Sequence, residues 1–235
     1  MSRVQRQYRS GIRSGQARQT RQRVLDAATA VFLDGGYGAA TMRGVAAKAG
    51  VSVGTVELMF GTKARLLKAA IDVAIAGDDE PVRILDRSWA ARARSSATAE
   101  KFLSLVAGRI AAAQARSAGL VLAVFEGSAK DPELEQLTEQ MVTQRAVTAA
   151  WIVEGVSQLA ALREGCTTAA ATDTVWLLMD SVVFDRLTRR RHWTLERYER
   201  WFADSVARLL TDDPSPRGEK SPAQRSLRTT GIGKE

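Results

Sequence analysis

The placement of proline restricts the fold of this chain more than any other sequence feature. The 235 residues contain five prolines, and only Pro81 and Pro132 precede residue 212. The long stretches without proline are rich in Ala, Leu, Arg and Glu, and β-branched residues rarely cluster in them, which favours helix over strand. The sequence therefore predicts an all-α protein with about nine helices and no strand.

Apolar residues three and four positions apart show where these helices lie. Asp131 and Pro132 form a start signal, because Asp can cap a helix and Pro suits its first position. The last two helices are expected at about 168–191 and 194–211. The other helical patterns cover residues 24–32, 66–74, 102–113 and 134–156.

Positive charge is concentrated in the first third of the chain. Residues 1–68 contain 12 Lys and Arg against 3 acidic residues, whereas residues 69–235 contain 22 against 23. Such asymmetry indicates a polyanionic partner, either nucleic acid or an acidic membrane surface. The alternative is a basic tail without a partner. A membrane-bound helix would need a bulky apolar face, which residues 1–17 lack.

Residues 42–60 have the pattern of a helix-turn-helix. Val45, Ala46 and Ala49 share one face of a short helix, and Gly50 suits the left-handed position that ends it. Ser52 can cap a second short helix, which Val56 would pack against the first. An ordinary helical hairpin would share these positions, but this segment also lies in the basic third of the chain.

At these residues the sequence resembles the TetR/AcrR-type helix-turn-helix transcriptional regulators. The resemblance implies an N-terminal helix-turn-helix domain joined to a helical effector-binding and dimerisation domain. It implies a homodimer that binds double-stranded DNA at a palindromic operator, and a repressor released by a small-molecule effector. Activation instead of repression stays open. The matching segments are 23–28, Gly36-Tyr37, Ala40-Thr41, 49–56, 60–63 and Leu66-Leu67.

Four segments are expected along the chain. They are a disordered basic arm at 1–17, the DNA-binding domain at 18–64, the ligand-binding and dimerisation domain at 65–211, and a disordered tail at 212–235. The longest apolar run, 120–125, is far too short to span a membrane. We therefore expect a cytoplasmic protein.

The resemblance also assigns roles to residues of the first domain. It makes Arg43 a base-contacting residue, and it makes Thr41 and Lys63 phosphate-contacting residues. The exposed start of the recognition helix is then 53–55. The full set of candidate DNA-binding residues is Thr41, Arg43, Ser52, Val53, Gly54, Thr55, Glu57, Leu58, Met59 and Lys63.

Residues 57–59 depart from the family pattern, which has aromatic residues and His there. Glu57 would be repelled by phosphates, but it could accept a hydrogen bond from a cytosine amino group. Pairing of Glu57 with a nearby Arg is an equal alternative. Leu58 could meet a thymine methyl group or face solvent. The operator sequence therefore cannot be transferred from relatives.

Candidates in the second domain come from apolar helix faces and polar residues on them. Arg109 is expected on such a face, paired with Glu126 or with an acidic ligand. The candidate ligand-binding residues are Phe102, Arg109, Phe125, Trp151, Trp176 and Met179. The candidate dimer-interface residues are Trp176, Phe184, Trp193, Trp201 and Phe202. Aromatic residues at helical spacing are usually plain core, which is the alternative for each of them.

Composition argues against catalysis. The chain has one histidine, His192, one cysteine, Cys166, and no phosphate-binding loop pattern. This leaves few groups for a nucleophile, a general base or a metal centre. We expect no enzymatic activity, no catalytic or metal-binding residues and no cofactor.

Overall fold

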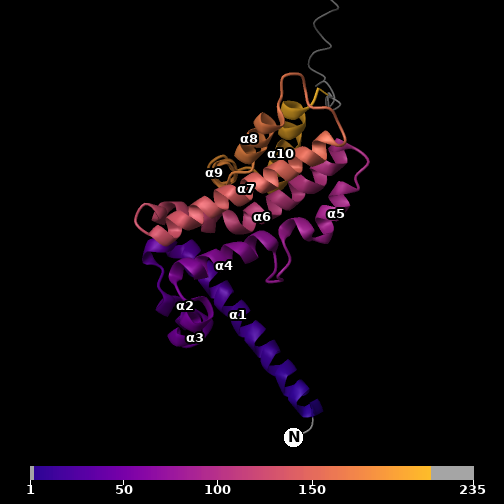
Figure 1. The fold of residues 1–235 in the computed structure, drawn as a ribbon. Coiled ribbons are helices and arrows are strands. Elements are labelled where there is room, and N and C mark those ends of the chain that lie inside the picture. Colours follow the sequence, from indigo (N-terminus) through magenta and orange to yellow (C-terminus); the bar gives the residue numbers. More distant parts are fainter. Residues whose placement is uncertain (1–2, 213–235) are drawn as a thin grey trace, which may run out of the picture.

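The computed structural model describes residues 3–212, with side chains from residue 15 onward. This range contains ten α-helices and no strand, which confirms the all-α prediction (Figure 1). The N-terminal helices are α1 (Arg3–Ala39), α2 (Met42–Ala49), α3 (Val53–Phe60) and α4 (Lys63–Ala76). They are followed by a 3-10 turn η1 (Ile84–Asp86), α5 (Ser88–Arg94), α6 (Ala99–Ser128), α7 (Pro132–Ser157), α8 (Thr168–Leu178), α9 (Ser181–Asp185), a π-helical turn η2 (Arg186–Arg190) and α10 (Leu195–Leu210).

Most of these helices begin at a side-chain cap. Asp131 accepts a hydrogen bond from the Glu133 amide, and Pro132 follows at the first helical position of α7. The predicted start of this helix is therefore confirmed. The same device begins α6 at Thr98 and α10 at Thr194. Such caps satisfy amide groups that have no partner inside the helix.

The sequence predicted disordered segments at both ends of the chain. Helix α1 already begins at Arg3 and projects past α2 and α3 (Figure 1), whereas the sequence predicted a disordered arm at 1–17. The segment contains no proline and is rich in Arg and Gln, so a helix formed by the following residues can continue into it. The predicted C-terminal tail, 212–235, lies outside the described residues apart from Asp212.

The predicted helix 168–191 is interrupted in the structure. Helix α8 ends at Leu178, and Asp180 accepts a hydrogen bond from the Val182 amide and so begins α9. The chain then widens into the π-helical turn η2. Apolar spacing alone misses this break, because the break depends on one side chain competing for a backbone amide.

Two hydrophobic clusters share the long helices α6 and α7. The first joins α1–α4 to Leu120 and Val124 of α6 and to Leu134 of α7. The second joins α5 and α7–α10 to the other half of α6, including Phe102 and Val106. The predicted boundary at residue 64 therefore does not coincide with a gap in packing.

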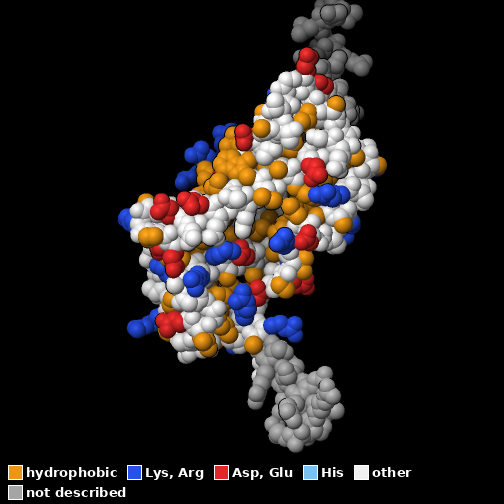
Figure 2. All heavy atoms as spheres, viewed as in Figure 1, with side chains coloured by type: hydrophobic (Ala, Val, Ile, Leu, Met, Phe, Trp, Pro, Cys, Tyr) orange, Lys and Arg blue, Asp and Glu red, His pale blue; other side chains and the backbone are white. Residues whose placement is uncertain are grey.

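Apolar and basic side chains are unevenly distributed on the surface of the helical domain. In the space-filling view, apolar side chains form a patch over the region of α8 and α9, and Lys and Arg side chains lie at its edge (Figure 2). Among the described residues, no helix has the length and hydropathy that crossing a membrane requires.

The second cluster offers a test of packing at the α6–α7 crossing. A Cβ atom at Gly155 would lie 2.2 Å from Cζ of Phe102, whose ring is fully buried. Gly155→Ala should lower the free energy of unfolding by about 1–3 kcal/mol through overpacking. Gly38→Ala is the control, because a Cβ there meets nothing within 4 Å. Urea denaturation of both variants makes the measurement, and equal stability would contradict this account of the crossing.

Candidate nucleic-acid interface and its junction with the helical domain

Helices α2 and α3 form a helix-turn-helix through local hydrogen bonds. Gly50 ends α2 with φ 67° and ψ 39°, a left-handed conformation that glycine adopts without strain. The amide of Val51 then donates to Ala46 O at 3.0 Å. Ser52 caps α3 by accepting from the Thr55 amide at 3.1 Å. Val45, Ala46, Ala49 and Val56 are buried, as the motif predicts.

This packing leaves one face of the motif exposed to solvent. Gly54, Glu57 and Leu58 are exposed on α3, and Leu58 keeps 90% of its surface accessible. Thr41, Arg43 and Ser52 are also exposed, while Val53, Thr55 and Met59 are half-buried against the first cluster or the cap. Glu57 forms no ion pair with any described residue. Six of the predicted residues, Thr41, Arg43, Ser52, Gly54, Glu57 and Leu58, are therefore exposed.

Lys63 faces the inside of the domain. Its Nζ donates to Tyr37 O at 2.8 Å and to Ala40 O at 3.1 Å, and it lies 3.9 Å from the centre of the Tyr37 ring. Two of the three ammonium donors thus satisfy carbonyls at residues 37 and 40, which leaves one donor for the predicted phosphate contact. A sequence shows that Lys63 follows a helix cap, but not that a helix end lies beside it.

The same region joins the first domain to α7. The Tyr37 hydroxyl donates to Asp131 Oδ2 at 2.7 Å, and the Thr62 hydroxyl donates to Glu133 Oε2 at 2.6 Å. Burial is the main cause that raises the pKa of Tyr37, and the hydrogen bond to Asp131 is the second. The same hydrogen bond lowers the pKa of Asp131. Two residues at the start of α7 thus hold the ends of α1 and α3–α4.

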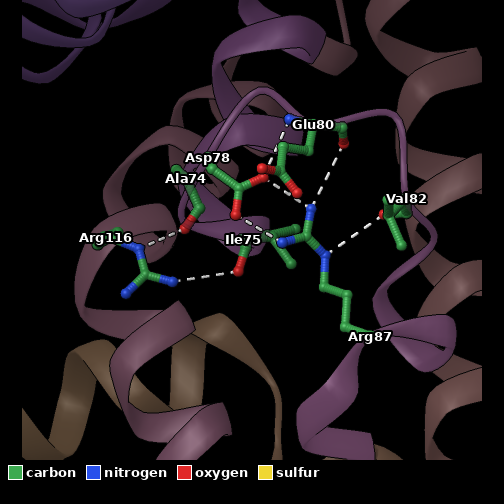
Figure 3. A network of polar contacts seen from close by, with 7 residues as sticks. All are labelled: Ala74, Ile75, Asp78, Glu80, Val82, Arg87 and Arg116. Atoms are coloured by element: carbon green, nitrogen blue, oxygen red, sulfur yellow. Dashed lines mark hydrogen bonds and ion pairs between the residues drawn. The ribbon is translucent and has the colours of Figure 1, made fainter.

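A second junction fixes the C-terminal end of α4 (Figure 3). Arg116 of α6 donates to Ala74 O at 2.7 Å and to Ile75 O at 3.2 Å, so it satisfies carbonyls that α4 leaves unpaired. Arg87 binds both oxygens of Asp78 just beyond, at 2.6 and 2.8 Å. The hydrogen bonds from Arg87 lower the pKa of Asp78 to about 2.

Arg21 adds a further link to this loop. Its Nε lies 2.6 Å from Asp79 Oδ2, and its guanidinium lies 4.9 Å from the centre of the Phe60 ring. None of these junction contacts was predicted, because their partners are 9 to 94 residues apart and each residue type is common on surfaces.

The predicted ligand-binding residues do not line a single pocket. Phe102 and Trp151 are buried in the second cluster with ring centres 5.5 Å apart, and Trp176 and Met179 pack against that cluster. Phe125 instead packs against the first cluster. Arg109 is exposed, because the buried stripe of α6 runs through 103, 106, 107 and 110 and leaves Leu105 and Arg109 on the next face. The proposed Arg109–Glu126 pair is absent among the described residues.

The predicted dimer-interface residues also divide into two groups. Phe184 and Phe202 are buried within this chain, where both rings pack on Tyr198, so they are core residues and not interface residues. Trp176, Trp193 and Trp201 are half-buried. Trp193 and Trp201 meet edge to face at 5.9 Å, and Arg145 lies 3.8 Å from the Trp176 ring centre. Amphipathic spacing identifies the apolar face of a helix but not the element that covers it.

Cys166 is half-buried and unpaired in the described part of the chain. The same part contains no group of three His, Cys, Asp or Glu side chains arranged to hold a metal ion.

The fold and the exposed motif define an all-helical protein with an N-terminal helix-turn-helix. Residues 24–70 match the model of the family described as bacterial regulatory proteins, tetR family. The N-terminal domain of this chain therefore belongs to the tetR family, which confirms the resemblance.

Relatives and solved structures agree with this assignment. The repressor KstR of Mycobacterium tuberculosis is 33% identical over 133 residues, which are 54% of this chain and 57% of KstR. This chain thus matches little more than half the length of that relative. NalD of Pseudomonas aeruginosa, the secondary repressor of the MexAB-OprM multidrug efflux pump, has a TM-score of 0.62 at 17% identity, covering 85% of this chain and all of NalD.

A further solved structure contains a bound ligand. The transcriptional regulator FadR of Bacillus subtilis, in complex with stearoyl-CoA, has a TM-score of 0.60 at 20% identity, covering 80% of this chain and 97% of FadR. At these identities, the likeness of both solved structures shows the shared fold alone.

The Tyr37–Asp131 contact predicts a pH dependence of stability. At pH 7, Tyr37→Phe should lower the free energy of unfolding by about 0.5–1.5 kcal/mol. Because the folded-state pKa of Asp131 is lowered, its contribution is complete above its unfolded-state pKa and is lost as the pH falls through the folded value. The difference between wild type and variant should therefore shrink in acid.

Denaturation between pH 2 and pH 7 measures this difference. Asp131→Asn is the control, because an amide can still cap α7 but does not titrate. A constant gap between wild type and Tyr37→Phe across the range would contradict the assigned role of Asp131.

Proposed function

We propose that this chain is a transcriptional repressor that binds a palindromic operator as a homodimer and is released by a small-molecule effector. The observation that carries the proposal is the exposed face of α3 in a tetR-family domain, where Gly54, Glu57 and Leu58 are free of contacts that would cover them. An eight-residue helix presented in this way fits the major groove of DNA. Its relative KstR is a repressor, which supports this sign of regulation.

The exposed residues differ in whether they suit contacts with bases or with phosphates. Arg43 has a planar fork that can bind guanine N7 and O6, and Glu57 can accept from a cytosine amino group. Thr41 caps α2 through the Gly44 amide at 3.0 Å, so the exposed N-terminus of α2 can face a phosphate. The excess of 12 cationic over 3 acidic residues in 1–68 supplies attraction that does not depend on sequence. Such a role belongs in the cytoplasm, where bacterial DNA lies.

Arg43 and Lys48 make a matched pair for testing base reading, because both are exposed cations on α2. An operator is first obtained by selection from a random DNA pool. Arg43→Ala should then weaken operator binding by about 1–3 kcal/mol and relax preference at one position in each half-site. Lys48→Ala should weaken operator and scrambled DNA equally and reduce the salt dependence by about one phosphate contact.

Titrations of both variants on both DNAs at several salt concentrations make this measurement. If Arg43→Ala weakens the two DNAs equally, Arg43 contacts phosphate and the bases are read by α3 alone. If wild-type binding shows no salt dependence, the DNA-binding proposal itself is wrong.

Dimerisation is proposed through α8 and α10, which pack against each other at the end of the chain. Leu177 of α8 is 57% exposed and Leu209 of α10 is 40% exposed, so each helix presents apolar surface that a second copy can bury. A twofold dimer would place two copies of α3 on half-sites about 34–36 Å apart.

The double variant Leu177→Glu, Leu209→Glu should sediment as a folded monomer, because neither leucine is part of the core. Leu58→Glu is the control, since Leu58 is the most exposed of the large apolar residues but lies on the DNA-facing helix. This control should stay dimeric and lose operator binding. A double variant that remains dimeric would show that the interface lies elsewhere.

Release by an effector requires that a change in the helical domain alters the position of the DNA-binding domain. The contacts of Arg116 with α4 and of Tyr37 and Thr62 with α7 provide this connection. An effector that shifts their arrangement needs a coupling of about 1–3 kcal/mol per site to change DNA affinity 5- to 150-fold. The ligand bound by the FadR structure supports an effector for this fold.

A further inference from the structure

A cavity of about 280 Å³ opens beside η2, and none of the predicted ligand-binding residues lines it. It lies between the middle of α6, the end of α9, η2 and the start of α10. Its lining combines apolar side chains with the polar residues Gln114, Asp185, Thr188 and Arg189. Ala115, Gly119 and Trp193 also line it.

The backbone around the cavity is irregular where α9 gives way to α10. Residues 186–190 form a π-helical turn, and His192 has φ 54°, a conformation that residues other than glycine seldom adopt. Both features are rare and are enriched at functional sites. They turn the chain so that the Trp193 amide donates to Leu187 O at 3.0 Å. Trp193 is thereby held at the cavity edge.

Trp193 is also fixed by its side-chain neighbours. The Arg197 guanidinium lies 4.2 Å from its ring centre, and Trp201 meets its ring edge to face at 5.9 Å. A cation over an aromatic ring and an edge-to-face pair both restrict the ring. The cavity therefore has a rigid aromatic wall.

The charge at this cavity favours an anion. Arg189 keeps 67% of its side chain exposed, and its Nε lies 3.2 Å from Asp185 Oδ1, which leaves its terminal nitrogens available. The lining acid is thus already paired. Residues 185–200 contain six arginines against three acidic residues. Figure 2 shows the corresponding arrangement over this region, with an apolar patch bordered by Lys and Arg.

We propose that this cavity binds a small apolar carboxylate, with the carboxylate on Arg189 and the apolar body against Trp193. This inference deepens the proposed function by giving the effector a site and a chemical class, and it rests on that function only for the effect on DNA. An arginine can bind a carboxylate through two parallel hydrogen bonds, which a neutral ligand cannot accept as strongly.

The cavity is also connected to the DNA-binding domain. A Cβ atom at Gly119 would lie 2.5 Å from Cδ2 of Leu33 on α1 and 3.2 Å from Nη2 of Arg189. Helix α1 and η2 therefore meet across one glycine of α6. A ligand that draws the Arg189 guanidinium into the cavity changes the packing beside Leu33. Helix α1 is broken after Leu33, at Gly36, but it packs against α2 of the helix-turn-helix, which provides the path for that change.

The probe is 2-naphthoate, with 2-naphthamide as its neutral counterpart of the same shape. Isothermal titration calorimetry on the full chain should show that naphthoate binds at least about tenfold more tightly than the amide, the factor expected for one charge-assisted contact. Arg189→Gln should weaken naphthoate binding by about tenfold and leave amide binding unchanged. Arg190→Gln is the matched control, because Arg190 is exposed on the same turn but does not line the cavity.

A second variant tests the location. Ala115 is exposed on α6 and lines the cavity, so Ala115→Trp should fill the space and abolish naphthoate binding without loss of folding, checked by circular dichroism. Equal binding of acid and amide, equal effects of the Arg189 and Arg190 variants, undiminished binding by Ala115→Trp, or no binding at millimolar naphthoate would each overturn the site.

Operator titrations with and without naphthoate separate this inference from the proposed function. Naphthoate should weaken operator binding by wild type and by Arg190→Gln, but not by Ala115→Trp. Binding that depends on Arg189 but leaves operator affinity unchanged would refute the connection through Gly119. A chain that binds naphthoate but no DNA would refute the repressor and leave the site standing.

Discussion

The sharing of helix α6 between two hydrophobic clusters is the constraint on which the rest of the structure depends. Its 30 residues extend about 45 Å at about 1.5 Å per residue. Leu120 and Val124 lie in the cluster with the helix-turn-helix, while Phe102 and Val106 lie in the other. Neither cluster could be complete without its half of this helix. A rotation of α6 would therefore alter the packing of both, since close-packed interiors deform little.

Polar contacts at the rim of this shared packing set the orientation of the first domain. Apolar surfaces tolerate small sliding movements, whereas hydrogen bonds have restricted distances and angles. Arg116 holds the end of α4, and Tyr37 and Thr62 hold the start of α7. These contacts lie at two places, the end of α4 and the start of α7, so together they restrict the relative arrangement of the domains. A switch between two arrangements would need to exchange such contacts.

The sequence predicts what is local and misses what is distant. Gly50, Ser52 and Asp131 act on backbone groups within five residues, so their roles follow from the order of residues alone. The sequence does not show that Lys63 also donates to carbonyls at residues 37 and 40. It misassigned Phe184 and Phe202 because Tyr198 covers them within the same chain. The prediction that Arg109 lies on the buried face of α6 was wrong, because a shift of one position along a helix is enough to separate a buried face from an exposed one. The predicted DNA-binding residues other than Lys63 all belong to α2, α3 or their caps, which form a single local motif.

The distribution of tryptophan gives this architecture an optical consequence. All five tryptophans follow residue 88, and four of them belong to or pack against the second cluster, while the fifth, Trp193, pairs with Trp201. The buried residues of the first cluster are instead Ala, Val, Leu, Ile, Phe and Tyr. Fluorescence excited at wavelengths that only indole absorbs therefore originates entirely outside the helix-turn-helix domain. Tryptophan fluorescence therefore reports on the packing of the second cluster and gives no signal from the first.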